Sequence, residues 1–223
     1  MPLKLNKLPS PPLLYLITDR HQFSPQPQIA WQAQLEVIAE AAQAGCQLIQ
    51  IREKDLSASE LSEFVRAAIT VARGTKILVN DRVDVALATG ADGVHLRTNS
   101  LPVADIRRHL SAQLLIGVST HSLAEAQAAE AGGADFIVCG PVYPTPSKSS
   151  YGVPLGINRF AAICHEVNLP VLALGGITMD NFSDCFSHQA SGIAAISLFN
   201  NRNTLGTNIK IVLSSRLGLQ DEV

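Results

Sequence analysis

The sequence has little that would tie this chain to a membrane, to nucleic acid or to an export route. Its longest apolar runs are strand-sized, well short of the about 20 residues that a membrane-spanning helix needs. The net charge is −2, so no excess of positive charge attracts nucleic acid or an anionic membrane. Residues 1–8 lack the apolar core of a signal peptide. We therefore expect a cytoplasmic protein with neither nucleic acid nor a membrane as a partner.

Cysteine is also scarce, and its spacing excludes the common cysteine-based sites. The chain has 4 cysteines, Cys46, Cys139, Cys164 and Cys185, and none of them forms a C-x-x-C pair. This spacing predicts reduced and mostly buried thiols, and it gives no indication of a zinc site.

The sequence does contain a regular alternation of apolar runs and amphipathic stretches. The expected strands are residues 14–17, 48–52, 77–79, 93–96, 114–118, 136–139, 171–174 and 193–196. Helical spacing of apolar residues is clear in 31–44, 59–72 and 123–131, whereas the segment after residue 200 is weakly patterned.

This alternation predicts the fold class. Strands that are almost continuously Val, Ile and Leu are covered on both faces, as in a parallel sheet. Eight strand–helix repeats with short connections, in 223 residues that are 47% hydrophobic, predict a single (β/α)8 TIM barrel rather than an open doubly wound sheet. We expect one domain over residues 1–223, with its core at about residues 13–199.

A pair of glycines ends the seventh expected strand. Gly175 and Gly176 have no Cβ, so a ligand can approach their backbone N–H groups closely. A helix is expected to begin near Thr178 or Asp180. Exposed N–H groups and a helix N-terminus together suit a phosphate. The eighth strand runs into Ile196 and is expected to end at Ser197, and the loops after the last two barrel strands often form one phosphate site. The alternative is that the glycines only make a tight turn.

Polar residues also follow the other expected strands, where a barrel places its active site. Gln50, Arg52 and Lys54 are spaced by two and so point to one side of the strand, which suits a mouth that receives an anion. The alternative is that Arg52 and Lys54 are surface charges. His95 lies inside a strand, where we expect a buried histidine whose hydrogen bonds are satisfied.

Several of these strand ends resemble one known family. The phrases that carry the resemblance, in family order, are Thr18-Asp-Arg20, Gln50-Ile-Arg-Glu-Lys54, Val79-Asn-Asp-Arg82, Gly93-Val-His-Leu96, Gly117-Val-Ser-Thr-His121, Gly140-Pro-Val-Tyr-Pro-Thr-Pro-Ser-Lys148 and Ala173-Leu-Gly-Gly-Ile177. Over about residues 13–199 the chain resembles the thiamine phosphate synthase/TenI family, whose fold is the α/β barrel.

The resemblance implies one of two activities on related substrates. The synthase joins a thiazole phosphate to a hydroxymethylpyrimidine diphosphate with loss of pyrophosphate. The TenI-type enzyme is a tautomerase that aromatises a carboxythiazole phosphate by moving a proton. Both bind a thiazole phosphate, so the site at Gly175, Gly176, Ile196 and Ser197 would serve either.

The synthase resemblance also implies roles for individual residues. It places Gln50, Arg52, Lys54 and Asn80 against the pyrimidine and its diphosphate. Ser119 would contact the leaving group or the pyrimidine. The phosphate charge would be neutralised on the loop after the sixth strand by Thr145, Ser147 and Lys148. Asp81 would bind Mg²⁺, which takes oxygen ligands and stabilises a departing diphosphate as a Lewis acid.

The sequence departs from the synthase pattern after the fourth strand. The family has His-Leu-Gly-Gln-x-Asp there, with the Asp as second metal ligand, whereas this chain has Arg97 at the glycine and Ser100 at the Asp. A hydroxyl is a poor substitute for a carboxylate, and Arg97 adds positive charge near the expected cation. Arg97 could instead pair with a substrate carboxylate or phosphate, and Asp81 could hold a metal ion or only brace Arg82.

A tautomerase needs a proton carrier and no metal cofactor. His121 stands where the TenI-type enzyme has its acid/base histidine, and histidine titrates near neutral pH. Its alternative role is to cap the helix after the fifth strand. The glycine- and proline-containing loop 147–156 could close over bound substrate.

These observations favour a TenI-like thiazole tautomerase with His121, Arg52 and Lys54 as the catalytic candidates. The first alternative is thiamine phosphate synthase with Mg²⁺, and the second is a non-catalytic thiazole-phosphate-binding barrel. The expected partners are small molecules, a thiazole phosphate and in the synthase case the pyrimidine diphosphate. The family resemblance also leads us to expect a homo-oligomer.

Overall fold

The strands close into a barrel in which every neighbouring pair is parallel. The computed structural model describes residues 8–110, 114–145 and 153–216. The closed order is β1-β2-β3-β4-β5-β6-β7-β8, and β1 pairs with β8. The strands are β1 (Leu13–Ile17), β2 (Leu48–Ile51), β3 (Lys76–Asn80), β4 (Gly93–Leu96), β5 (Leu115–Thr120), β6 (Phe136–Cys139), β7 (Val171–Leu174) and β8 (Gly192–Ala195). The predicted (β/α)8 fold is confirmed.

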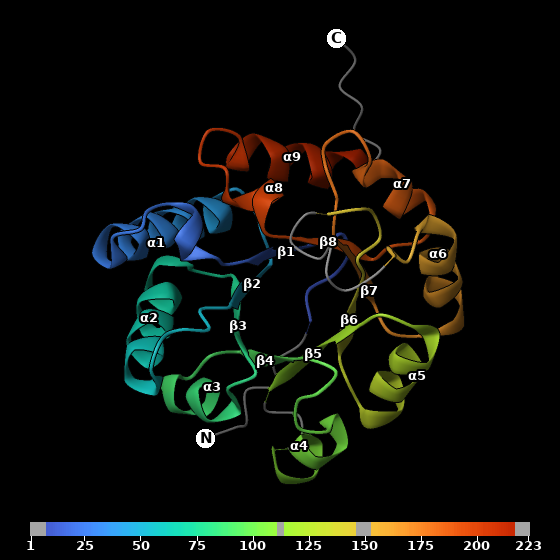
Figure 1. The fold of residues 1–223 in the computed structure, drawn as a ribbon, viewed down its shortest axis with the longest axis horizontal. Helices are drawn as coiled ribbons and strands as arrows, with labels where there is room; N and C mark the ends of the chain where they lie inside the picture. The colour runs from blue at the N-terminus through green and yellow to red at the C-terminus, as the bar shows by residue number, and fades with distance from the viewer. Residues whose placement is uncertain (1–7, 111–113, 146–152, 217–223) are drawn as a thin grey trace.

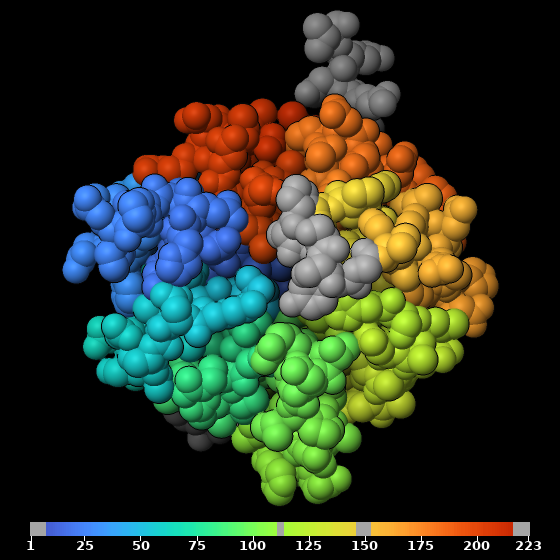
Figure 2. All heavy atoms as spheres, viewed as in Figure 1, coloured from blue at the N-terminus to red at the C-terminus, as the bar shows by residue number. Residues whose placement is uncertain are grey.

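Helices surround the barrel and alternate with its strands (Figure 1). They are η1 (Arg20–Gln22), α1 (Pro27–Gln43), α2 (Ala58–Val71), α3 (Val83–Thr89), α4 (Val103–Leu110), α5 (Leu123–Gly132), α6 (Ile157–Glu166), α7 (Phe182–Ser187), α8 (Ser197–Asn200) and α9 (Leu205–Arg216). In the space-filling view, successive parts of the chain follow one another around the molecule (Figure 2). Each strand–helix unit therefore contacts mainly its neighbours in sequence.

Two helices extend beyond what the sequence pattern indicated. α1 begins at Pro27, a residue that suits the first turn because that turn needs no N–H donor there. The weakly patterned segment after residue 200 forms α9, which buries Leu205, Ile209 and Val212.

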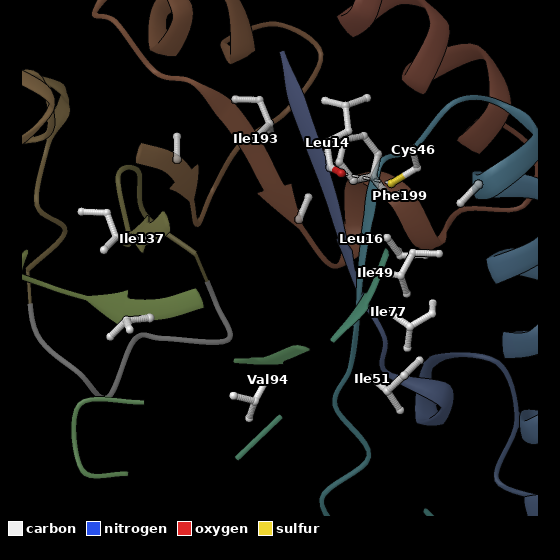
Figure 3. Packing of buried hydrophobic residues seen from close by; sticks show 14 of the residues in the cluster. Leu14, Leu16, Cys46, Ile49, Ile51, Ile77, Val94, Ile137, Ile193 and Phe199 are labelled. Carbon is white, nitrogen blue, oxygen red and sulfur yellow. Dashed lines mark hydrogen bonds between the residues drawn. The ribbon is translucent and has the colours of Figure 1, made fainter. Parts of the chain in front are cut away.

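The strands separate two apolar cores. Ile49 and Ile51 belong to the larger core, which lies between the barrel and the helices (Figure 3). Leu48 and Leu78 belong to the smaller core inside the barrel. Because side chains alternate along a strand, Gln50 lies on the inner face with Leu48, and the outward-facing isoleucines fill the helix-covered face.

The cysteines are placed as the sequence predicts. Cys46, Cys139 and Cys185 are buried, Cys164 is half-buried, and all of them are free thiols. Burial raises the pKa of Cys46 and Cys139 to about 12, so both are protonated at neutral pH. Among the described helices, none combines the length and the apolar character that crossing a bilayer requires.

Candidate functional site

The inner face of the barrel becomes polar at the carboxyl ends of β2 to β5. Strand register places Gln50 beside Ile17 and Leu78 of the inner core. Asn80 pairs with His95 in the same way, and residues paired in a parallel sheet share a face. The apolar filling of the barrel is therefore topped by amide and imidazole groups, at the end where barrels bind ligands.

Arg52 and Lys54 follow β2 and bring positive charge to this end. Partial burial lowers the pKa of Lys54 from its ordinary value, and the charges of Arg52 and Arg97 lower it further, while Asp19 and Asp81 act in the opposite direction. Within the described ranges, neither the Arg52 guanidinium nor the Lys54 ammonium has a hydrogen-bond or ion-pair partner. Neighbouring unpaired cations of this kind suit an anionic ligand.

A buried network fixes the segment that carries these two cations. Arg20 donates to Glu53 at 2.8 Å, with side chains only 5% and 1% exposed, and it also donates to Asp55 at 2.7 Å. Thr18 donates to Glu53 at 2.6 Å and accepts from the Arg52 backbone N–H at 2.9 Å. The Arg20 guanidinium holds the pKa of the Asp55 carboxyl well below its usual range.

Glu53 was not identified from the sequence. Its only sequence signal is an acidic residue between two cations directly after a buried strand, which is also typical of a solvated surface. The structure shows instead that it ties the end of β1 to the segment after β2.

Asp81 is held by residues from the next strand end. Its φ of 60° lies in the left-handed region, which aspartate adopts more readily than most residues. Its N–H donates to the His95 carbonyl at 2.9 Å, and its two carboxylate oxygens accept from Arg97 Nε and Ser100 Oγ. Arg82 pairs with Asp84, so the possibility that Asp81 braces Arg82 is not what the structure shows.

This arrangement does not fit a magnesium site. Mg²⁺ takes oxygen ligands, commonly from carboxylates, water and substrate phosphates, but Asp81 is already paired with the Arg97 guanidinium, and its other neighbour at this position is the neutral hydroxyl of Ser100. Arg97 also places a positive charge directly on this carboxylate.

His95 links the inner core to Ser119. The Tyr15 hydroxyl lies 3.2 Å from His95 Nδ1, and His95 Nε2 lies 2.9 Å from Ser119 Oγ. Burial lowers the pKa of His95 to about 3, so the ring is neutral. A Cβ at Gly117 would come within 2.8 Å of His95 Nδ1, which explains the glycine at this position. The prediction of a buried, hydrogen-bonded histidine is confirmed.

The partners of His95 define its tautomer. Among the described residues, the buried Tyr15 hydroxyl has only Nδ1 of His95 within hydrogen-bond range, so it satisfies its O–H by donating to Nδ1. The ring proton is then on Nε2 and is donated to Ser119. The hydroxyl hydrogen of Ser119 remains available to a ligand.

The residues predicted to bind the thiazole phosphate line one cavity. Its volume is about 280 Å³, and its lining includes Thr145, Gly175, Gly176, Ile196 and Ser197. Ser147 and Lys148, and most of the proposed closing loop 147–156, lie outside the described residues.

Both glycines of this cavity are required by the backbone. Gly175 and Gly176 have φ of 95° and 65°. A Cβ on Gly175 would lie 2.6 Å from Pro141, and one on Gly176 would lie 2.5 Å from the Pro144 carbonyl. The backbone therefore accounts for both glycines as a tight turn, and the approach of a ligand stays a prediction.

Two local expectations at this cavity were wrong. α7 begins at Phe182 rather than near Thr178 or Asp180, because the Asn181 side chain accepts from the Thr178 N–H and donates to the Gly176 carbonyl, forming a turn before the helix. Ser197 does not end β8 but begins α8.

A second cavity lies beside Arg97. Its volume is about 480 Å³, and it is lined by Arg97, Ser100 and Ser119 at the strand ends and by residues of α4 and α5. Two of the predicted site residues, Arg97 and Ser119, thus share a cavity distinct from the glycine cavity.

His121 lines neither of these two cavities. Its ring Nδ1 lies 3.1 Å from Glu125, and its backbone N–H donates to the same carboxylate at 2.6 Å. Ser122 caps α5 by accepting from the Glu125 N–H at 3.2 Å. His121 therefore takes part in the start of α5, the alternative role considered for it.

Comparison with known proteins gives a consistent result. Residues 14–199 match the family described as thiamine monophosphate synthase. A Geobacter sulfurreducens protein named "Putative thiamine-phosphate synthase" is 49% identical over 186 residues, 82% of this chain and 84% of that protein. The thiamine-phosphate synthase of Roseiflexus sp. strain RS-1 is 36% identical, over 83% of this chain and 77% of its own. The structure of thiamine phosphate pyrophosphorylase from Pyrococcus furiosus superposes with a TM-score of 0.79 at 32% identity, covering 92% of this chain and 97% of that one.

Proposed function

Because the chain belongs to the thiamine monophosphate synthase family, we propose that this enzyme of thiamine biosynthesis is a thiamine-phosphate synthase. It would join a hydroxymethylpyrimidine diphosphate to a thiazole phosphate. The sequence alone favoured a TenI-like tautomerase, but the named relatives are synthases. The proposal reverses the order of those two candidates.

The observation that supports the proposal is that two groups of residues suited to anions follow different strands of the barrel. Arg52 and Lys54, whose charged groups have no partner among the described residues, follow β2, while the glycine cavity lies after β7 and β8. Two substrates that each carry phosphate need two such groups, and binding both holds their reacting atoms in one orientation.

The chain's own residues account for the steps of the reaction. Arg52 and Lys54 bind the diphosphate and stabilise the negative charge that grows when its C–O bond breaks. Ser119, oriented by His95, donates a hydrogen bond to the leaving group or the pyrimidine and keeps its proton. Gln50 and Asn80 also contact the pyrimidine and its diphosphate. Gly176 and Ser197 hold the thiazole phosphate while the ring nitrogen forms the new N–C bond. The electron pair of the broken bond leaves with pyrophosphate, and no proton transfer is needed.

The direct test mixes purified protein with both substrates and measures thiamine phosphate by conversion to a fluorescent thiochrome. We expect turnover in the wild type and, in Lys54→Ala, a loss of about 100-fold in kcat/KM, because one charge-assisted contact to the leaving group is removed. Lys210→Ala, at an exposed position of α9, is the matched control and should retain wild-type activity. Absence of thiamine phosphate from well-folded wild type would reject the synthase proposal.

The second candidate is the tautomerase, favoured by the contact between His121 and Glu125. A carboxylate beside an imidazole can orient it for proton transfer. The two candidates differ in their response to His121→Gln. This variant should lose carboxythiazole phosphate tautomerisation if His121 carries the proton, whereas the synthase reaction, which moves no proton, should continue.

The non-catalytic alternative has its own expected result. A thiazole phosphate would raise the melting temperature of the protein while neither product forms. The same preparations answer this question, so all three functions are separated by one set of measurements.

A further inference from the structure

We infer that Arg97 is a built-in cation of the barrel mouth, so that this chain binds the diphosphate of its substrate without a divalent metal ion. The inference rests on the proposed function for the identity of the anion. It concerns how the charge of that anion is balanced, which the proposed function leaves open.

The first argument is that the Arg97 side chain is held in place by Asp81, which Ser100 also contacts. Asp81 accepts from Arg97 Nε and from Ser100 Oγ. Ser100 Oγ in turn accepts from the Arg97 backbone N–H at 2.8 Å. Three residues from two strand ends therefore form a closed set of contacts that fixes the guanidinium at the mouth.

The second argument is that Arg97 still has donors to offer. Among the described residues only its Nε is engaged, and its side chain is 51% exposed. The terminal nitrogens of a guanidinium carry most of its N–H groups, in a planar arrangement that matches phosphate oxygens. The residue can thus contact Asp81 and an anion at the same time.

The third argument is the local charge. Arg97 acts electrostatically on Lys54 together with Arg52, and Asp19 and Asp81 are the nearby carboxylates. Arg97 therefore adds a third cation beside Arg52 and Lys54 that is present before any metal binds. A divalent cation at Asp81 would lie beside the Arg97 guanidinium, which like-charge repulsion opposes.

The first experiment measures binding of inorganic pyrophosphate by titration calorimetry, in EDTA and in Mg²⁺. Wild-type affinity should differ by less than about twofold between the two conditions, whereas Arg97→Gln should weaken binding in EDTA by about 10-fold or more. The matched control is Arg108→Gln, which removes an exposed arginine of α4 that pairs with Asp105, and it should bind as the wild type does. A loss of about 10-fold in wild-type affinity on adding EDTA would overturn the inference.

The second experiment attempts to create the metal site that Arg97 replaces. The double variant Arg97→Gly/Ser100→Asp frees Asp81 and adds a second carboxylate beside it. We expect this variant to bind Mn²⁺, detected by electron paramagnetic resonance, and to need a divalent ion for pyrophosphate binding. Wild type should show no Mn²⁺ site that depends on Asp81; a wild-type Mn²⁺ signal that Asp81→Asn abolishes would contradict the inference.

Failure of this inference and failure of the proposed function give different results. Pyrophosphate and Mn²⁺ binding are measured without turnover. Metal-independent pyrophosphate binding with no thiamine phosphate formed would reject the synthase proposal and keep the metal-free anion site. EDTA-sensitive binding with full turnover in Mg²⁺ would reject the metal-free anion site and keep the synthase proposal. If the double variant does not fold, the wild-type comparison in EDTA still decides.

Discussion

At the scale of single residues, His95 is a buried polar side chain whose proposed role is to orient Ser119. Its ring lies between the Tyr15 hydroxyl and Ser119 Oγ, and it packs against Tyr15 and Phe136, with ring centroids 5.6 Å and 6.2 Å away. In this position the neutral ring donates to Ser119 Oγ and leaves the Ser119 hydroxyl hydrogen available. The same burial makes the stability of the protein depend on pH.

We predict that His95 destabilises the fold in acid. Burial lowers its folded-state pKa from 6.5 to about 3, so the unfolded chain takes up a proton that the folded chain does not. Relative to acid, the protein has its full unfolding free energy from this residue above pH 6.5. That contribution is lost as the pH falls toward 3, by up to about 1.4 kcal/mol per pH unit. Urea unfolding between pH 7.5 and 4.5 measures this slope.

The variants separate His95 from other acid-sensitive groups. His95→Gln should reduce the slope by up to one proton, while His109→Gln, at an exposed position of α4, should keep the wild-type slope. An NMR titration of wild type in which the His95 ring protonates near pH 6 would contradict the prediction, whether or not the variant folds.

At the scale of elements, the site depends on contacts between successive strand ends. The network of Thr18, Arg20, Glu53 and Asp55 joins β1 to the segment after β2, and the contacts of Asp81 join β3 to the segment after β4. In both cases, contacts with a charged residue of the neighbouring strand–helix unit hold a loop in place. The glycine pair after β7 is placed differently, by close packing against residues 141–144.

Gly176 should therefore be much less replaceable than a glycine that only has positive φ. Gly176→Ala adds a Cβ 2.5 Å from the Pro144 carbonyl and keeps the left-handed backbone, so we expect a loss of about 3 kcal/mol or more in unfolding free energy. Gly90→Ala is the matched control: Gly90 has φ of 73° with nothing within 4 Å of its Cβ position, and it should cost about 1–2 kcal/mol.

Urea unfolding gives the stability of both variants, and calorimetry gives their affinity for inorganic phosphate. Gly176→Ala should weaken phosphate binding, and Gly90→Ala should not. Equal stability costs together with unchanged phosphate binding would remove Gly176 from the proposed site.

At the scale of the whole molecule, the barrel brings charges from separate strand–helix units to one end, so ligand binding should stabilise the entire fold. A ligand at 100 times its Kd adds about 2.7 kcal/mol to the unfolding free energy, which for a chain of this size raises Tm by about 5–10 °C. We expect inorganic pyrophosphate to do this near neutral pH.

The stabilisation should decline at alkaline pH. Partial burial and the charge of Arg52 lower the pKa of Lys54 from 10.5, whereas a bound anion would raise this pKa again. At a pH near the pKa of free Lys54, binding of the anion is therefore coupled to protonation of Lys54. The melting shift given by pyrophosphate should therefore shrink with rising pH in the wild type and remain flatter in Lys54→Gln. A wild-type shift that does not change up to pH 10 would contradict the role given to Lys54.

The sequence by itself determined the barrel and the position of its candidate site. The apolar strand runs and the order of the repeats predicted eight parallel strands, and the spacing of Gln50, Arg52 and Lys54 predicted polar groups at the end of a strand whose other face is apolar. These are local patterns, since each depends on residues close together in the chain and on the fixed alternation of side chains along a strand.

The tertiary structure alone decided which side chains meet. The contacts of Asp81 with Arg97, of Tyr15 with His95 and of Arg20 with Glu53 span 16, 80 and 33 residues. No sequence spacing predicts them, because they depend on closure of the barrel and on the direction in which each side chain leaves its strand end. For the same reason the ends of β8 and the start of α7 differed from expectation, as the Asn181 side chain forms a turn where the sequence indicated a helix.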